Sequence, residues 1–233
     1  MLEGRFVEMN HFYHYVISAK SVTKRRQAQI ERFAKWGMQP QFFDAIMGNQ
    51  LSEEELDKLS ATEGLLTLGE IGCDLSHLGV YQKLLDSQEK CVYVFEDDAK
   101  VTDEFIKLQP KIQQFMEEQS EPTVLVLCTI IGHKKSIRKI SPDVSIMKCL
   151  AGTRAYAYVL NRKAAENLLK AQMPVKIELD AWAIYQKLGF IRLYCLSKDV
   201  VQLDEALDKD SIIDNISDRF VRDRQKVKIL KDK

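Results

Sequence analysis

The 233-residue sequence has no excess of either charge, no long apolar run and no internal repeat, and each absence excludes a class of protein. Because 34 basic side chains balance 34 acidic ones, no overall field attracts the chain to nucleic acid or to a membrane. No apolar segment is long enough to span a bilayer, and the N-terminus lacks the basic segment and apolar core of a signal peptide. We therefore expect an ordinary globular protein of the cytoplasm.

The five cysteines are odd in number, and none stands in CxxC spacing. They are Cys73, Cys91, Cys128, Cys149 and Cys195. Free cysteines near the ends of predicted strands usually act as small core hydrophobes. We therefore expect a reducing compartment, no disulfide framework and no zinc site.

Alternating strand and helix patterns indicate an α/β domain with a mostly parallel central sheet flanked by helices. The expected strands cover 12–17, 41–45, 92–95, 123–128, 154–160 and 190–196. The expected helices are capped by, or begin at, Thr23, Ser52, Gly69, Asp103, Asn161 and Asp180, and the fourth is bent or restarted at Pro110. Residues 132–149 carry a cluster of lysine and arginine and predict a mobile segment or a hairpin.

The two ends of the chain are set apart from a single catalytic domain over 9–215. Residues 1–8 are expected to be an expression scar before a natural start at Met9. Residues 216–233 form a basic tail, in which apolar side chains are interleaved with lysine and arginine. Two interpretations stay open: a solvated tail, or peripheral attachment of 219–233 to an anionic membrane, worth about 1 kcal/mol per basic residue.

The most informative feature is a run of three acids, Glu96, Asp97 and Asp98, directly after the apolar strand 92–95. Such acids can simply form a turn or cap a helix. Ligands of open α/β sheets, however, bind at the carboxyl ends of strands, and clustered carboxylates favour a hard divalent cation. We expect a metal held there, with Asp98 as its main ligand because the chain turns outward at that residue.

Several stretches together resemble glycosyltransferase family 25, which includes bacterial lipooligosaccharide galactosyltransferases and collagen-modifying relatives. In chain order they are Val16–Ser18 with Arg25–Arg26, Gln41–Ala45, Gly69–Cys73, Ser76–His77, Val94–Asp98, Gly152–Thr153 leading to Tyr158, the 164–169 helix, and Leu179–Asp180. Their order and spacing carry the resemblance, which covers almost the whole chain.

The resemblance implies a GT-A, Rossmann-like fold and an inverting transfer of galactose from UDP-galactose to a terminal sugar of lipooligosaccharide. It also implies a divalent cation, Mn²⁺ or Mg²⁺, for which Asp98 and Glu96 are the expected ligands, while Asp97 is expected to contact the nucleotide-sugar. One carboxylate of this run would bind the metal and another would hydrogen-bond a ribose hydroxyl. The expected site of action is the inner face of the cytoplasmic membrane. An inverting transfer needs a base for the acceptor hydroxyl, and the family position suggests Asp180. That residue could equally be an N-cap of the helix that follows.

Further candidates for contact with the nucleotide-sugar follow from the same resemblance. They are Ser18, Arg25, Arg26, Glu70, Gly72, His77, Gly152, Thr153 and Gln202. A guanidinium suits a diphosphate, but at least one of the two arginines is expected in a solvated first helical turn. His77 could instead be a core residue, and Trp182 is expected to be buried. Glu70 and Gly72 could shape a loop near the donor or serve as scaffold.

Two other classes of function fit the sequence less well than a transferase. A phospho-signalling receiver needs an aspartate and a lysine at the ends of other strands, and no such pair is evident. A nucleotidyltransferase usually has a glycine-rich loop after the first strand, and residues 18–21 contain no glycine. A non-catalytic sugar-nucleotide sensor stays the alternative. The basic 134–139 stretch lies where the family varies most, so the acceptor cannot be inferred from the resemblance.

Overall fold

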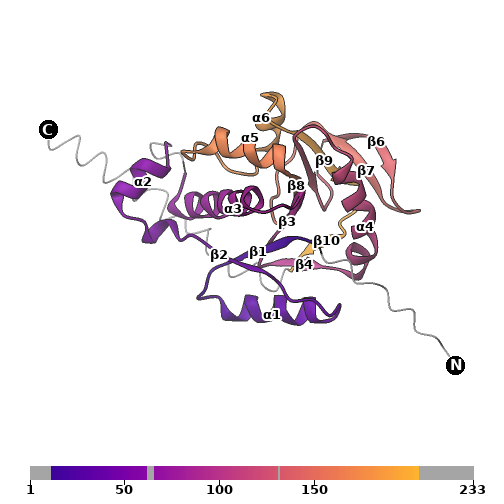
Figure 1. Cartoon of the computed structure of the whole chain (residues 1–233), viewed down its shortest axis with the longest axis horizontal. Coiled ribbons are helices and arrows are strands. Elements are labelled where there is room, and N and C mark those ends of the chain that lie inside the picture. The colour runs from indigo at the N-terminus through magenta and orange to yellow at the C-terminus, as the bar shows by residue number, and fades with distance from the viewer. Residues whose placement is uncertain (1–11, 62–65, 131, 205–233) are drawn as a thin grey trace.

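The computed structural model describes residues 12–61, 66–130 and 132–204 (Figure 1). The expectations for 1–8 and for the basic tail 216–233 lie outside the described residues. An eight-stranded sheet with the order β2-β1-β3-β8-β5-β9-β7-β6 forms the centre. Its strands are β1 (His14–Ser18), β2 (Phe42–Asp44), β3 (Cys91–Glu96), β5 (Thr123–Val126), β6 (His133–Lys139), β7 (Ser145–Cys149), β8 (Ala157–Asn161) and β9 (Arg192–Leu196).

Most strands of this sheet share one direction. β1 is parallel to β2 and β3, and β5 is parallel to β9, whereas β8 lies antiparallel between β3 and β5. β7 is antiparallel to both β9 and β6. Six of the eight strands therefore run one way and two, β7 and β8, run against them. The predicted α/β class with a mostly parallel sheet flanked by helices is confirmed.

Helices cover both faces of the sheet (Figure 1). On one face, Phe33 of α1 (Thr23–Ala34) stacks on His14 and contacts Phe95, and Phe105 of α4 (Asp103–Glu117) also contacts Phe95. On the other face, α3 (Leu68–Asp86) packs against β3 and along α5 (Arg162–Gln172). Because successive residues of a strand point to opposite faces, side chains at the end of β3 can meet either α1 or α3.

Helix boundaries follow the sequence closely, with differences at the caps. The Ser52–Glu55 capping box of α2 (Glu53–Leu59) and the Asn161 cap of α5 are confirmed. Thr23 was expected as a cap but is already the first residue of α1. Thr102 caps α4 in place of Asp103, because its hydroxyl accepts from the Phe105 N–H at 3.2 Å. The expected restart at Pro110 is wrong, since α4 continues through that residue.

The remaining elements are a hairpin, a two-stranded ladder and two short helices. Strands β6 and β7 form the hairpin that was one of the two expectations for 132–149. A separate two-stranded ladder pairs β4 (Ala99–Val101) with β10 (Val201–Leu203), which no local pattern predicted. Two short helical elements complete the description, η1 (Gly48–Gln50) and α6 (Trp182–Lys187). All five cysteines are free, as expected. No helix within the described ranges combines the length and apolarity needed to cross a bilayer.

Candidate active site

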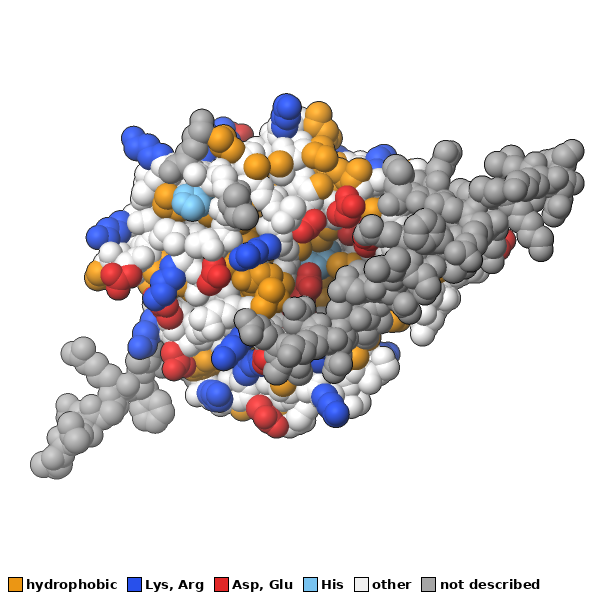
Figure 2. Space-filling model, turned by 180° about the vertical axis from the view of Figure 1, so that it is seen from behind, with side chains coloured by type: hydrophobic (Ala, Val, Ile, Leu, Met, Phe, Trp, Pro, Cys, Tyr) orange, Lys and Arg blue, Asp and Glu red, His pale blue; other side chains and the backbone are white. Residues whose placement is uncertain are grey.

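A cleft of about 470 Å³ opens where β1 and β3 end. Its walls come from the β1–α1 connection, η1, the first half of α3, the acidic end of β3, and the segments before β8 and α6. Acidic side chains gather around the hollow in the middle of the face shown in Figure 2. Eight residues predicted from sequence line the cleft: Ser18, Arg25, Glu70, His77, Glu96, Asp97, Asp98 and Asp180.

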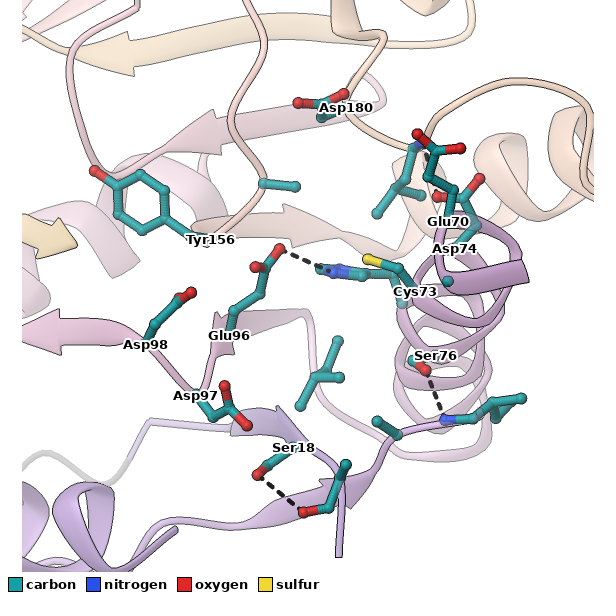
Figure 3. A pocket seen from close by; sticks show the side chains of 18 of the residues that line it. Ser18, Glu70, Cys73, Asp74, Ser76, Glu96, Asp97, Asp98, Tyr156 and Asp180 are labelled. Carbon is teal, nitrogen blue, oxygen red and sulfur yellow. Dashed lines mark hydrogen bonds and ion pairs between the residues drawn. The ribbon is translucent and has the colours of Figure 1, made fainter. Parts of the chain in front are cut away.

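The three consecutive acids have different neighbours, because β3 ends at Glu96 and the chain turns at Asp97 and Asp98. Glu96 turns toward α3, where its carboxylate lies 3.5 Å from His77 Nε2. Asp97 turns toward α1 and accepts a hydrogen bond from Arg25 at 2.7 Å, in an ion pair whose side chains are about one-tenth exposed. Asp98 follows at the mouth of the cleft, 3.9 Å from the same guanidinium. Figure 3 shows the carboxylates of Glu96 and Asp98 on the cavity side, with that of Asp97 turned away.

Helix α1 fixes the backbone of the acidic run as well as its charge. The Gln29 amide donates to the carbonyls of Asp97 and Ala99 at 2.9 and 2.7 Å. The two adjacent arginines have separate partners. Arg25 faces Asp97, whereas Arg26 donates to the Ser18 carbonyl and to Asp44, each at 2.6 Å. One arginine therefore lines the cleft and the other ties β1 to β2.

Asp180 approaches the cleft from the opposite wall (Figure 3). Helix α6 begins at Trp182 after Ala181, so Asp180 is not its N-cap. Instead its carboxylate accepts a hydrogen bond from the backbone N–H of Arg154 at 2.9 Å. Burial, with the neighbouring charges of Glu96 and Glu178, raises the pKa of Asp180. A carboxylate with a raised pKa is a stronger proton acceptor once ionised.

Trp182 and Arg154 support this wall. Trp182 is fully buried, as expected, and its indole N–H donates to the Arg154 carbonyl at 3.2 Å. Arg154 has a φ of +86°, a left-handed backbone conformation that is uncommon for any residue but glycine. The hydrogen bonds to Asp180 and from Trp182 engage both polar groups of this one residue's backbone. They hold the strained residue where its side chain borders the cleft.

His77 is both a core residue and a cleft residue. Its Nδ1 lies 2.7 Å from the Tyr158 hydroxyl, which in turn lies 2.7 Å from the Tyr81 hydroxyl. All three side chains are fully buried. The imidazole is therefore held from behind, while Nε2 faces Glu96. The sequence left open whether His77 is a core residue or a residue that contacts a ligand. In the structure its side chain is buried and also lines the cleft.

The start of α3 adds acids to the same cleft. Glu70 closes a capping box, because its carboxylate accepts from the Thr67 N–H at 2.7 Å while Thr67 accepts from the Glu70 N–H. Asp74, not predicted, accepts from the Leu179 N–H at 3.0 Å and so ties α3 to the segment that carries Asp180. Burial raises the pKa of Asp74 to about 8.

Several cleft residues were missed from sequence, chiefly Cys73, Asp74, Arg154, Tyr156 and Glu178. A signal for two of them was present, because Glu70, Cys73, Asp74 and His77 recur at helical spacings of three and four. Side chains at those spacings share one helix face. No local pattern marked Arg154, since its position depends on partners 26 and 28 residues away.

Five predicted residues do not line the cleft: Arg26, Gly72, Gly152, Thr153 and Gln202. Both glycines allow close packing. A Cβ on Gly72 would lie 2.4 Å from the Ile46 carbonyl oxygen, and one on Gly152 would lie 1.6 Å from Ile130. Thr153 is exposed, and Gln202 is an exposed residue of β10 opposite Lys100. The structure therefore places these five residues outside the lining of the cleft.

The fold is an α/β fold whose acidic cleft lies at the carboxyl ends of the parallel strands β1 and β3. The model of the family "Glycosyltransferase family 25 (LPS biosynthesis protein)" matches residues 11–183. The chain therefore belongs to glycosyltransferase family 25.

The match between this chain and its known relatives covers only part of each relative's length. The Haemophilus influenzae "Lipooligosaccharide biosynthesis protein lic2B" is 27% identical over 164 residues, 66% of this chain and 61% of the relative. The human "Procollagen galactosyltransferase 2" is 24% identical over 172 residues, 67% of this chain and 27% of the relative. A Bos taurus relative, 24% identical over 176 residues, is named "Probable inactive glycosyltransferase 25 family member 3". This chain thus spans less than two thirds of the length of these relatives.

Among solved structures, A197 from STIV superposes with a TM-score of 0.42 at 11% identity, covering 82% of this chain and 83% of that one. A likeness of this size assigns no function.

Proposed function

We propose that the chain transfers galactose from UDP-galactose to a terminal sugar of a lipooligosaccharide, with inversion at the anomeric carbon and with Mn²⁺, or Mg²⁺ in its place. The observation that carries the proposal is the placement of Glu96 and Asp98 on one side of the cleft and Asp180 on the other. Family membership and the names of the bacterial and human relatives support the sugar and the acceptor class.

The residues at the end of β3 fit a hard divalent cation. Asp97 is committed to Arg25, which leaves Glu96 and Asp98 as the oxygen donors on the cavity side. Carboxylate oxygens are the ligands that Mn²⁺ and Mg²⁺ prefer. Several acids in one cleft repel one another, and a cation would relieve that repulsion and admit an anionic diphosphate. When bound, the cation would stabilise charge on the departing UDP.

Asp180 is proposed as the base that takes the proton of the acceptor hydroxyl. Its Oδ2 holds the Arg154 N–H, and Oδ1 has no hydrogen-bond partner among the described residues. One oxygen thus orients the carboxylate while the other is available to an acceptor. The raised pKa suits general base catalysis, since a stronger base accepts the proton more readily.

The donor would occupy the side of the cleft nearest β1. Ser18, Arg25, Glu70 and His77 line the cavity and remain candidates for contact with the nucleotide-sugar. Asp97 is proposed to act through Arg25, whose guanidinium it holds in place. Arg26, Gly72, Gly152, Thr153 and Gln202 would influence donor binding through the walls of the cleft. The sensor alternative shares this donor site and differs in having no turnover.

Calorimetric titration tests the proposal directly. UDP-galactose, UDP-glucose and UDP-N-acetylglucosamine are each titrated with and without Mn²⁺, followed by a transfer assay on lipooligosaccharide acceptors. Manganese-dependent binding of UDP-galactose with turnover is the expected result. Preference for another donor would keep the enzyme class and change the sugar. Binding without turnover on any acceptor would favour the sensor, and no binding at all would overturn the transferase.

A further inference from the structure

Three potential metal ligands of different chemical type meet at one point of the cleft. Cys73 and His77 lie one turn apart on the same face of α3, and Glu96 is the last residue of β3. Their ligand atoms, a sulfur, a nitrogen and a carboxylate oxygen, all lie within 4.8 Å of one another. Figure 3 shows the Cys73 sulfur beside the contact between Glu96 and the imidazole.

The imidazole is held in the way that metal-binding histidines usually are. One ring nitrogen, Nδ1, lies 2.7 Å from the Tyr158 hydroxyl, and the Tyr81 hydroxyl fixes Tyr158 in turn. The other nitrogen, Nε2, is buried and makes no hydrogen bond within the described ranges. A buried polar nitrogen without a hydrogen bond is uncommon, and its neighbour here is the Glu96 carboxylate at 3.5 Å. A hydrogen bond behind one ring nitrogen, with the other nitrogen directed at a possible metal position, is the usual support of a metal ligand.

We propose that Cys73, His77 and Glu96 bind a zinc-class divalent cation through sulfur, Nε2 and a carboxylate oxygen. Thiolate and imidazole favour zinc, whereas Mg²⁺ and Mn²⁺ prefer oxygen donors. Three protein ligands leave a fourth position, which faces the cleft. In a tetrahedral zinc site the ligand atoms would lie roughly 3.3–3.8 Å apart, so small side-chain rotations of Cys73 and Glu96 would complete the geometry.

Binding of the metal releases one proton from the protein. The Cys73 thiol gives its proton to solvent as its sulfur bonds to the cation, and the imidazole binds as the neutral ring. The resulting thiolate and the Glu96 carboxylate together balance the two positive charges of the metal. The site therefore places no net charge in the cleft. The sequence expectation that the cysteines form no zinc site is thus reopened at Cys73 alone.

Glu96 would serve both this site and the oxygen site at Asp98. Because both cations would draw on the Glu96 carboxylate and two neighbouring divalent cations repel each other, a zinc-class ion is expected to weaken Mn²⁺ binding and inhibit transfer. This consequence rests on the proposed function, whereas binding of the zinc-class ion itself does not. The two can therefore fail separately.

Cobalt titration of the metal-free full chain is the test, because Co²⁺ replaces zinc and a thiolate–cobalt bond gives a charge-transfer band in the near ultraviolet. We expect the band to saturate at one equivalent and to disappear on adding Zn²⁺. Cys73→Ser should abolish the band, and Cys91→Ser should retain it. Cys91 is the matched control. It is buried at the end of β3 opposite to Glu96, and its thiol contacts Gln113.

A second variant tests the support of His77 without removing a ligand. Tyr158→Phe should weaken Co²⁺ binding by about 10- to 100-fold while keeping the band, with folding checked by circular dichroism. The proposal is overturned if the wild-type chain shows no band, or if Cys73→Ser keeps it. Unchanged affinity in Tyr158→Phe would contradict the role of Nδ1. If cobalt binds but none of the three UDP-sugars does, the metal site stands and the transferase proposal fails.

Discussion

The carboxylate of Asp180 holds the backbone N–H of Arg154, the one described non-glycine residue with a positive φ. This contact joins the segment before α6 to the segment before β8 across the rim of the cleft. The side chain is oriented by a neighbouring backbone, which leaves its second oxygen for chemistry.

Asp180→Asn separates these two roles. The amide oxygen can still accept from Arg154, so the rim should keep its shape, but an amide cannot take a proton. We expect kcat to fall by about 10²–10⁴-fold, with UDP-galactose affinity in calorimetry within about twofold of the wild type. Unchanged turnover would remove Asp180 from the mechanism.

Asp98→Ala should abolish both transfer and the manganese dependence of UDP binding, because it removes an oxygen ligand from the cavity. Folding should be retained, as judged by the melting temperature. Asp143→Ala is the control, an exposed aspartate outside the cleft that should change neither property. Manganese-dependent binding that survives in Asp98→Ala would place the cation elsewhere.

Arg25→Met tests the buried pair between α1 and the acidic run. The variant leaves Asp97 as an uncompensated buried charge, so urea unfolding should show a loss of about 3–5 kcal/mol. Lys20→Met is the comparison, because Lys20 pairs with Asp44 at the surface, with side chains 78% and 50% exposed. Such pairs contribute about 0–1 kcal/mol. Equal effects of the two substitutions would contradict the structural role assigned to Arg25.

Asp74 gives the protein a dependence of stability on pH. Its pKa is about 8 when folded, against an ordinary value of 3.8, so between these values the folded state binds one more proton than the unfolded state. The free energy of unfolding should therefore fall as pH rises, by at most about 1.4 kcal/mol per pH unit from this group. The contribution is full below the ordinary pKa and is lost by about pH 8.

Asp74→Asn removes this titration but keeps an acceptor for the Leu179 N–H. Urea unfolding is compared between about pH 5 and pH 8, with EDTA present so that metal binding does not contribute. The wild type should lose more stability than the variant across that range. Parallel pH profiles would show that Asp74 is ionised in the folded protein.

Gly72→Ala tests whether this glycine is scaffold. The new Cβ would meet backbone atoms, 2.4 Å from the Ile46 oxygen and 2.6 Å from the Gly48 nitrogen. A loss of about 1–3 kcal/mol in unfolding free energy is expected, with weaker donor binding because η1 would shift. Gly79→Ala on the same helix should be milder, since its Cβ meets the end of the Phe43 ring, which can move. The reverse order would point to another role for Gly72.

Local patterns predicted the features that depend on neighbours in sequence. The apolar run before Glu96, the capping box at Ser52 and the Asn161 cap are set by residues within a few positions, and each is present. Sequence also placed Glu96, Asp97, Asp98 and Asp180 in what proved to be one cleft.

The structural features that the sequence did not predict depend on residues that are far apart in the chain. The insertion of β8 between β3 and β5, and the pairing of β4 with β10, are decided by tertiary packing. The different orientations of Asp97 and Glu96 follow from which helix lies on each face of β3, with Arg25 on one and His77 on the other. A single sequence read in short windows contains neither fact.

The pairing of β4 with β10 has a consequence for how the protein is made. The Asp204 N–H donates to the Asp98 carbonyl at 2.8 Å, and Asp204 also pairs with Arg32 of α1, so the acidic end of β3 is braced by a segment synthesised about a hundred residues later. During translation, β3 and α1 leave the ribosome long before this brace exists. The acidic loop should therefore settle only after Asp204 has also left the ribosome, which would delay capture of the proposed cation until the cleft around it has formed.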